Sequence, residues 1–223
     1  MNLLVLGRGK TGSLIEEVAA ARGHKVRTMG SDENTGAAAL SKEALAHFDC
    51  VIDFTTPTAV IPNIIACTQA GANIVVGTTG WYDKLPQVKE LVAHSKSGFL
   101  YGPNFSVGVN IFFEIASAAA AALKTGYTAR IVERHSAQKK DSPSGTAIKL
   151  KERMGSDDIE ITSIREGETV GQHVIMLDSP NDTMMLVHDA KSRRGFAEGA
   201  VVAAEWLQGK KGFYEFKDVV KQK

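Results

Sequence analysis

The sequence predicts an α/β protein with a parallel sheet first and a second, α+β domain after it. In the first half of the chain, short apolar runs alternate with helical patterns. After Pro103 comes a long alanine-rich stretch, and strand-like segments then follow one another with one clear helix among them. Apolar strands that alternate with helices indicate a parallel sheet covered on both faces, whereas strands in succession indicate a mixed or antiparallel sheet.

The elements of the first half can be assigned from apolar periodicity. Strands are expected where short apolar runs occur, at residues 2–6, 25–29, 50–54, 74–76 and 99–101. Helical spacing of apolar residues predicts helices at residues 11–22, 41–47, 58–70 and 85–95. Gly23 and Gly71 stop the first and third of these helices.

The second half has a different order of elements. Helices are expected at residues 108–124, 145–154 and 196–208, and strands at residues 128–135, 159–166, 171–177 and 183–188. Residues 212–220 are expected to form a short tail. We therefore expect one domain of residues 1–104, completed by residues 194–223, and a second domain of residues 105–193.

Composition excludes several classes of protein. The 223 residues are 43% hydrophobic and 23% charged, and the net charge is +1, so no overall field attracts nucleic acid or an anionic membrane. Cys50 and Cys67 lie in apolar runs without metal-ligand neighbours, and no metal site is expected. The apolar N-terminal run is too short for a signal peptide, and residues 107–123 contain Asn110 and Glu114 and are shorter than a membrane span. We expect a cytoplasmic protein.

A glycine-rich segment directly follows the first expected strand and opens the first expected helix. It reads Gly7-Arg8-Gly9-Lys10-Thr11-Gly12, a complete G-x-G-x-x-G. In this context Gly7 permits a tight turn, Gly9 lets the backbone approach a pyrophosphate, and Gly12 lets helix and strand pack closely. The helix N-terminus adds free N–H groups and a positive dipole end. The segment predicts a Rossmann-like domain that binds NADH or NADPH.

The end of the second strand should lie near the ribose of that cofactor. Asp32 there can bind the ribose hydroxyls of NAD, while Ser31 with Arg8 or Arg27 can accept the additional phosphate of NADP. Asp32 and Glu33 can equally be solvated loop charges. The sequence does not choose between the two cofactors.

Two further strand ends should line the same ligand, because ligands of open parallel sheets bind outside the carboxyl ends of the strands. The fourth strand is followed by Gly77-Thr78-Thr79, whose hydroxyls and backbone we expect to point toward the nicotinamide half. The fifth strand is followed by Gly102, Pro103, Asn104 and Phe105, where the pattern changes and a domain hinge is also possible.

Residues 133–146 concentrate chemical groups that suit an anionic substrate. His135 is a candidate proton donor because its ordinary pKa lies near neutrality, and Lys139 adds a positive charge. Ser144 is a good N-cap, so that Gly145 and Thr146 present N–H groups and a hydroxyl at a helix N-terminus, where a carboxylate can bind. A capped helix beside solvated lysines and a surface histidine explains the same residues without a ligand. His173 and His188 are expected to be structural.

This segment resembles the signature of the 4-hydroxy-tetrahydrodipicolinate reductase family, formerly dihydrodipicolinate reductase. The matching residues are Glu133, His135, Lys139, Asp141, Pro143, Ser144, Gly145, Thr146 and Ala147. The resemblance extends over most of the chain through residues 53–55, 77–80, 104–110, 164–167, 170–173, 188–190, 196–200 and 206–207.

The resemblance implies an NADH- or NADPH-dependent reductase that acts on a cyclic dicarboxylic imine in the diaminopimelate route to lysine. By position, His135 and Lys139 are the catalytic residues, and Ser136, Ser144, Gly145 and Thr146 contact the substrate. The first domain binds the dinucleotide and the second binds substrate and forms a homotetramer. No nucleic-acid or membrane partner is implied.

One position departs from the family pattern. Ser136 stands where the family has a second histidine, and a serine hydroxyl reaches less far and carries no charge. The alternative enzyme is another NAD(P)-dependent amino-acid or hydroxy-acid dehydrogenase, which gives residues 143–146 no specific purpose. A redox-sensing binding protein is a third reading, but no basic DNA-binding module is visible in the sequence.

Overall fold

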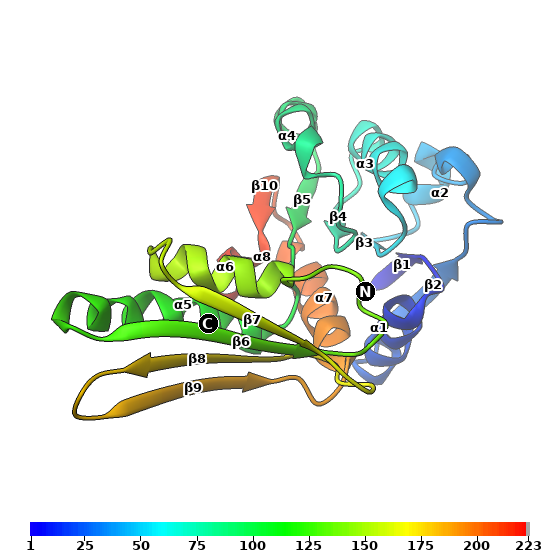
Figure 1. The fold of residues 1–223 in the computed structure, drawn as a ribbon. Helices are drawn as coiled ribbons and strands as arrows, with labels where there is room; N and C mark the ends of the chain where they lie inside the picture. The colour runs from blue at the N-terminus through cyan, green and yellow to red at the C-terminus, as the bar shows by residue number, and fades with distance from the viewer. Residues whose placement is uncertain (222–223) are drawn as a thin grey trace. The chain divides into compact units, whose positions relative to one another are not determined.

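The computed structural model describes residues 1–221 and separates them into two compact units (Figure 1). The first unit comprises residues 1–106 together with the chain from Arg194 onward, and the second comprises residues 107–193. The sequence predicted an α/β fold with a parallel sheet in the first domain and a mixed sheet in the second, and both predictions are confirmed.

The first unit is built on a six-stranded sheet in which all neighbouring strands are parallel. Its strand order is β10-β5-β4-β3-β1-β2. The strands are β1 (Asn2–Leu6), β2 (Lys25–Met29), β3 (Cys50–Asp53), β4 (Ile74–Val76), β5 (Gly98–Tyr101) and β10 (Gly212–Glu215). Strands β1, β3 and β4 are buried along nearly their whole length, as continuous apolar runs in a two-sided sheet require.

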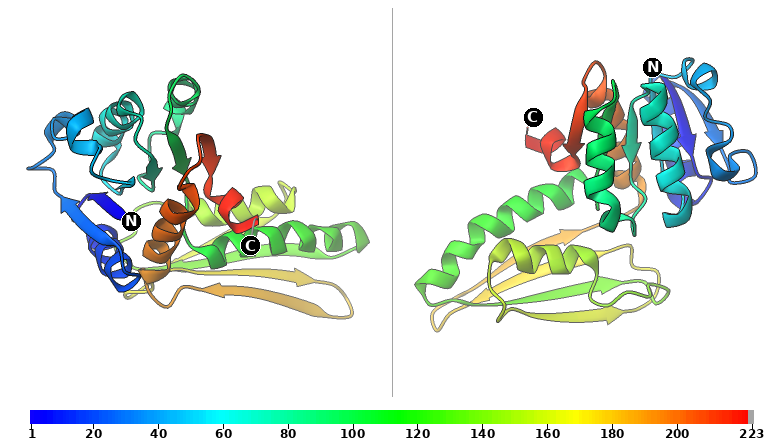
Figure 2. Two further views of the ribbon diagram at one scale, coloured as in Figure 1. Left: turned by 180° about the vertical axis from the view of Figure 1, so that it is seen from behind. Right: turned by 90° about the horizontal axis from the view of Figure 1, so that it is seen from above.

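Helices cover both faces of this sheet (Figure 2). The helices of the first unit are α1 (Lys10–Ala21), α2 (Lys42–Leu45), α3 (Pro57–Ala70), α4 (Leu85–Ala93), α7 (Arg194–Leu207) and α8 (Phe216–Lys221), with 3-10 turns at Thr35–Ala37 and Tyr82–Lys84. Helices α3 and α4 bury Val60, Ile64 and Val88 in one core cluster with sheet residues. Helix α7 contacts α1 and strands β3, β4 and β5.

The expected short tail at residues 212–220 is wrong. Residues 212–215 form β10, which pairs with β5 in parallel, and α8 follows at once. Phe213 stacks on Phe99 with ring centroids 5.1 Å apart, and Phe216 is buried. A strand of four residues has little pattern of its own, and here pairing with a distant strand determines its conformation.

The second unit is a four-stranded sheet with two helices on one face. Its strand order is β7-β6-β8-β9, with β6 and β7 parallel and the other pairs antiparallel. The elements are α5 (Val107–Ala119), a 3-10 turn (Ala120–Thr125), β6 (Thr128–His135), α6 (Gly145–Met154), β7 (Glu160–Arg165), β8 (Gln172–Asp178) and β9 (Thr183–Asp189). Ile131, Ile175 and Leu177 are buried with residues of α5 and α6.

The opposite face of this sheet carries apolar side chains that no helix of the second unit covers. Strand alternation places Val132, Ile164, Val174, Met176, Met185 and Val187 there, and we call this set the open face. Met185 is 58% exposed and Val187 is 54% exposed. Exposed apolar patches of this kind mark interaction surfaces.

Helix α5 also bears on the membrane question. With its 3-10 end, Val107–Thr125 comprises 19 residues and is long and apolar enough to cross a membrane by length and composition alone. The expectation that this stretch is too short is therefore wrong. Core helices pass the same test, and Val109, Phe112, Phe113 and Ala116 of this helix are buried with residues of the sheet and α6.

Candidate functional site

The glycine-rich loop between β1 and α1 depends on two glycines for its shape. Gly7 has a φ of 106°, and a β-carbon there would lie 2.3 Å from the Phe54 carbonyl oxygen. A β-carbon on Gly12 would lie 1.9 Å from the Gly7 carbonyl oxygen, so helix and strand touch at this point. A β-carbon on Gly9 would meet no atom within 4 Å. Gly9 therefore faces open space, as a residue that contacts a ligand should.

A pocket of about 590 Å³ opens beside this loop, at the carboxyl ends of β1, β2 and β3. Four of the predicted cofactor residues line it: Gly7, Arg8, Gly9 and Ser31. Within residues 1–221, the other predicted cofactor residues are not part of its lining. The pocket has the position that the parallel sheet requires for a dinucleotide.

Sequence reasoning missed several residues of this pocket. They are Asn34, Thr35, Gly36, Phe54, Thr55, Thr56, Thr58, Ala59, Pro62 and Asn63, in addition to the strand-end residues Leu6, Met29 and Gly30. The end of β3 was the available signal, because the rule that ligands bind outside the carboxyl ends of parallel strands, used above for the fourth and fifth strands, applies to the third strand as well. No sequence pattern placed the loop at residues 34–36 beside the pocket, because its position depends on hydrogen bonds between side chains that lie far apart in the sequence.

Those bonds form a buried polar network centred on Asp53, the last residue of β3. The Asp53 carboxylate accepts hydrogen bonds from Thr55 N at 3.0 Å, Asn63 Nδ2 at 2.8 Å and Thr78 Oγ1 at 2.9 Å. Asn34 Nδ2 donates in turn to Asn63 Oδ1 at 3.0 Å. Burial raises the pKa of Asp53, although its donors act in the opposite direction. The network joins the loops that follow β3 and β4 to the loop at residues 34–36.

The network also changes the interpretation of Thr78. Its hydroxyl donates to Asp53 and accepts from Thr55 N at 2.8 Å, so it points into the protein and not toward a ligand as expected. Farther along the edge, Phe105 is buried and packs against Phe54 and Phe216, with ring centroids 5.6 and 4.7 Å apart. Phe105 therefore acts in packing within the first unit.

Charged residues meet at the end of β2, where the ribose was expected. Arg8 forms an ion pair with Glu33 and lies 3.8 Å from Asp32, measured from Nη1 to Oδ1. Glu33 Oε2 also accepts from Gly30 N at 3.1 Å. Both expected chemistries, a carboxylate for ribose hydroxyls and a guanidinium for a phosphate, are thus present side by side.

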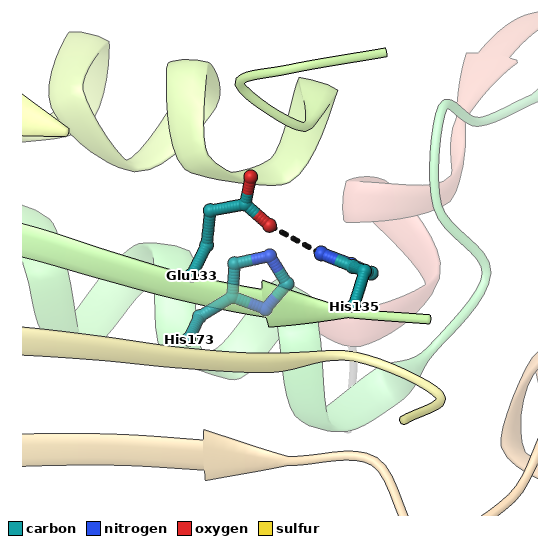
Figure 3. Close-up of side chains that lie close together, drawn as sticks. All are labelled: Glu133, His135 and His173. Atoms are coloured by element: carbon teal, nitrogen blue, oxygen red, sulfur yellow. Dashed lines mark hydrogen bonds and ion pairs between the residues drawn. The ribbon is translucent and has the colours of Figure 1, made fainter. Parts of the chain in front are cut away.

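In the second unit, polar side chains gather at one end of the helix-covered face of the sheet. Glu133 and His135 lie two residues apart on β6 and therefore point to the same face. The Glu133 carboxylate Oε2 forms a hydrogen bond with His135 Nδ1, and the Glu133 side chain is fully buried (Figure 3). Strand register pairs His135 with Arg165 on β7 and Glu133 with His173 on β8.

Arg165 connects this group to the loop that follows β6. Its Nη2 donates to Glu133 Oε1 and to the Asp141 carbonyl oxygen, both at 2.7 Å. Lys139, in the same loop, forms an ion pair with Asp141 of 2.8 Å between Nζ and Oδ1. The loop that carries Lys139 is therefore attached to the end of β7.

Ser144 forms the N-cap of α6, as predicted. Its hydroxyl accepts from Ala147 N at 3.2 Å and lies 3.2 Å from His173 Nε2, while its backbone N–H donates to Glu133 Oε1 at 3.3 Å. Ser144 is buried and its hydroxyl is occupied by these contacts. A β-carbon on Gly145 would meet no atom within 4 Å, so the first turn of α6 is open at that residue.

The surroundings of these groups set their ionisation. Burial opposes ionisation of Glu133, but hydrogen bonds from Arg165 and His135 outweigh it and lower the pKa of its carboxyl to about 2. The pKa of His135 lies below its ordinary value, mainly because of burial. Glu133 acts in the opposite direction, whereas the positive charges of Lys139 and Arg165 lower the pKa further. Burial, with a contribution from His135, lowers the pKa of His173 to about 3.

Glu133, His135 and His173 also have the composition of a metal site, with one ligand-type atom of each within 4.8 Å of the others. The charge balance of the cluster favours a hydrogen-bonded network. Glu133 is already paired with the guanidinium of Arg165, whose positive charge repels a cation.

Most of the expected substrate residues fall near this cluster. His135, Ser144 and Gly145 lie around it, and Lys139 lies in the attached loop. Glu133, Arg165 and His173 were not assigned to the site from the sequence. Three buried polar atoms on the same face, Arg165 Nε, His173 Nδ1 and His188 Nδ1, have no hydrogen-bond partner among the described residues. Unsatisfied groups of this kind suit a polar ligand.

Comparison with known proteins identifies the family. Models described as the N-terminus and the C-terminus of dihydrodipicolinate reductase match residues 1–105 and 108–220. The chain belongs to the dihydrodipicolinate reductase family. The resemblance found in the sequence is thereby confirmed.

Relatives within the dihydrodipicolinate reductase family match over most or all of their length. The 4-hydroxy-tetrahydrodipicolinate reductase of Christiangramia forsetii is 38% identical, over 99% of this chain and 98% of the relative. That of Laribacter hongkongensis is 35% identical, over 79% of this chain and 74% of the relative. The dipicolinate-bound dihydrodipicolinate reductase of Paenisporosarcina sp. TG-14 has the same fold, with a TM-score of 0.79 at 23% identity over 98% of each chain.

Proposed function

We infer that this chain is an NAD(P)H-dependent oxidoreductase that reduces 4-hydroxy-tetrahydrodipicolinate to tetrahydrodipicolinate in the diaminopimelate route to lysine. Membership of the family supports the activity. The observation that carries the chemistry is the cluster in the second unit. It combines an imidazole, an ammonium group and the N-terminus of α6 around one end of a sheet.

The residues of this cluster suit a ring with two carboxylates. In our proposal Gly145 and Thr146 bind one carboxylate at the N-terminus of α6, where N–H groups and the helix dipole favour an anion. Lys139 faces a carboxylate of the substrate and is a second proton donor. His135 gives a proton to the ring, from Nε2, as hydride arrives, and the 4-hydroxyl group leaves as water. A positioned acid of this kind contributes about 10²–10⁴-fold to the rate.

The first unit suits the cofactor. When bound, NADH or NADPH supplies the hydride, and the protein provides binding and orientation. The Gly7–Gly12 loop and the pocket of about 590 Å³ fit a pyrophosphate at a helix N-terminus. We propose that Arg8, Gly9 and Ser31 contact the dinucleotide, with the backbone of residues 77–79 and 102–104 farther along the same edge.

Assembly is proposed from the open face of the second unit. Its six apolar side chains, with Met185 and Val187 more than half exposed, suit contact with further copies of this chain. We propose a homotetramer joined through these sheets. We also propose a cytoplasmic protein without nucleic-acid or membrane partners, which agrees with the near-neutral net charge.

The decisive experiment is a spectrophotometric assay of NADH and NADPH oxidation with the freshly formed condensation product of pyruvate and aspartate semialdehyde. Lys139→Ala should raise KM for this product and lower kcat, and it should leave NADH affinity unchanged. Lys140→Ala is the matched control, because Lys140 is the exposed neighbour, and it should behave as the wild type. Absence of oxidation with both cofactors would refute the proposed function.

A further inference from the structure

The buried carboxylate of Glu133 bonds to three residues around the proposed substrate site. One oxygen bonds to His135 Nδ1, and the other accepts from Arg165 Nη2 at 2.7 Å and from Ser144 N at 3.3 Å. These three partners come from β6, from β7 and from the N-cap of α6. The Glu133 side chain has no exposed surface, so these partners, and not water, must stabilise its charge.

An ionised carboxylate can only accept hydrogen bonds, and this fixes the tautomer of its partner. Since Glu133 is ionised, the proton of neutral His135 must be on Nδ1, and Nε2 carries the lone pair. Protonation of the ring then occurs at Nε2, and the same nitrogen later gives up the proton. A β-carbon on Gly171 would lie 3.0 Å from this Nε2, so the glycine leaves the nitrogen free on that side.

The other oxygen of Glu133 acts on the binding groups. Its bond with Ser144 N holds the first turn of α6, and its bond with Arg165 holds the guanidinium that also binds the Asp141 carbonyl oxygen. Asp141 pairs with Lys139. The carboxylate thus connects the proton donor with both groups that are expected to bind substrate carboxylates.

We propose that Glu133 is the positioning residue of this site, which sets the tautomer of His135 and, through Arg165 and Ser144, the places of Lys139 and the N-terminus of α6. The proposal rests on the proposed function only for its kinetic consequences. It assigns Glu133 no contact with substrate, and its effects pass through the three partners.

The first test is made on the unmodified protein and needs no turnover. The six histidines are labelled with ¹⁵N, and long-range proton–nitrogen spectra of the full chain report which ring nitrogen carries the proton. The His135 signals are assigned by their loss in His135→Asn. Above the pKa of His135 we expect protonated Nδ1 and unprotonated Nε2. The opposite tautomer would overturn the proposal.

The second test is the pH dependence of Glu133→Gln. The charged groups that face His135 are Glu133 on β6, Lys139 in the following loop, Arg165 on β7 and His173 on β8. Only Glu133 raises the pKa of His135, so its neutralisation must lower that pKa. If the imidazolium is the active form, kcat/KM falls as pH rises through the pKa, and in Glu133→Gln this fall must occur at lower pH.

The expected changes in kcat and KM of Glu133→Gln follow from the same contacts. Loss of the set tautomer should remove part of the about 10²–10⁴-fold contribution of a positioned acid, so kcat should fall at least about tenfold. KM should rise, because the contact with Ser144 N is weakened. Glu166→Gln is the matched control. Glu166 follows the same strand as Arg165 but is 54% exposed and pairs with Arg134, and its variant should keep the wild-type pH profile.

Failures of the two proposals are distinguishable. If the wild type oxidises neither cofactor with the condensation product, the proposed function fails, and the tautomer measurement still judges Glu133. If the wild type is active but Glu133→Gln keeps its kcat and pH profile, the positioning role is refuted. Should Glu133→Gln not fold, the tautomer of the wild-type protein decides.

Discussion

Substitutions at two glycines of the β1–α1 loop should separate ligand contact from folding. Gly9 has a φ of −74° and a ψ of −178°, which any residue adopts, and a β-carbon there meets no atom within 4 Å. We therefore expect Gly9→Val to fold with a stability within about 1 kcal/mol of the wild type, equal to about 2–4 °C in Tm for a chain of this size.

The same substitution should prevent cofactor binding. A valine at position 9 projects where a pyrophosphate must approach the backbone. Two lost hydrogen bonds to a charged group, about 1.5–3 kcal/mol each, correspond to NADH binding at least about 100-fold weaker. Titration by protein fluorescence or calorimetry, together with thermal unfolding, measures both quantities.

Gly12→Ala should show the reverse pattern. Its β-carbon would lie 1.9 Å from the Gly7 carbonyl oxygen, so α1 must move away from β1. Such overpacking costs about 1–3 kcal/mol, a decrease in Tm of about 2–12 °C. Unchanged NADH affinity in Gly9→Val, or an unchanged Tm in Gly12→Ala, would show that the loop does not act as described.

Three further predictions concern other parts of the fold. Asp53→Ala should lower Tm, because each buried donor left unpaired at Asn63 and Thr55 costs about 1–3 kcal/mol, whereas Asp53→Asn should lower it less; equal Tm values would contradict the network. Gly171→Ala places a methyl group 3.0 Å from His135 Nε2 and should lower kcat at an unchanged Tm, while Gly195→Ala, with open space around its β-carbon, should retain wild-type kinetics. Val187→Glu should dissociate the proposed tetramer in analytical ultracentrifugation, and Met184→Glu, on the other face of β9, should not; a tetramer of Val187→Glu would exclude the open face as the assembly surface.

Most of the fold could be predicted because its elements are locally encoded. Strands β1, β2, β4 and β6 and helix α6 begin and end at the residues expected from apolar runs, caps and glycines. Strand β10 could not be predicted, since its four residues are stabilised by pairing with β5 and by the contact of Phe213 with Phe99.

The candidate site divides in the same way. The Gly7–Gly12 loop and the Ser144 cap are short-range motifs with a steric or hydrogen-bonding cause, and both were found in the sequence. The partnership of Glu133 with Arg165 and His173 depends on strand register, which no local pattern specifies. The direction of the Thr78 hydroxyl depends on Asp53, a buried carboxylate 25 residues away in the chain.

Strand β6 carries two kinds of surface in alternation. Glu133 and His135 point to the helix-covered face. Val132, which precedes them, and Arg134, which lies between them, point to the opposite face. A single inserted or deleted residue within β6 would exchange the two sets, turning the acid–base pair outward and burying an arginine. Single substitutions in β6 therefore affect one face at a time, whereas a change in the length of the strand disturbs the proposed substrate site and the open face together.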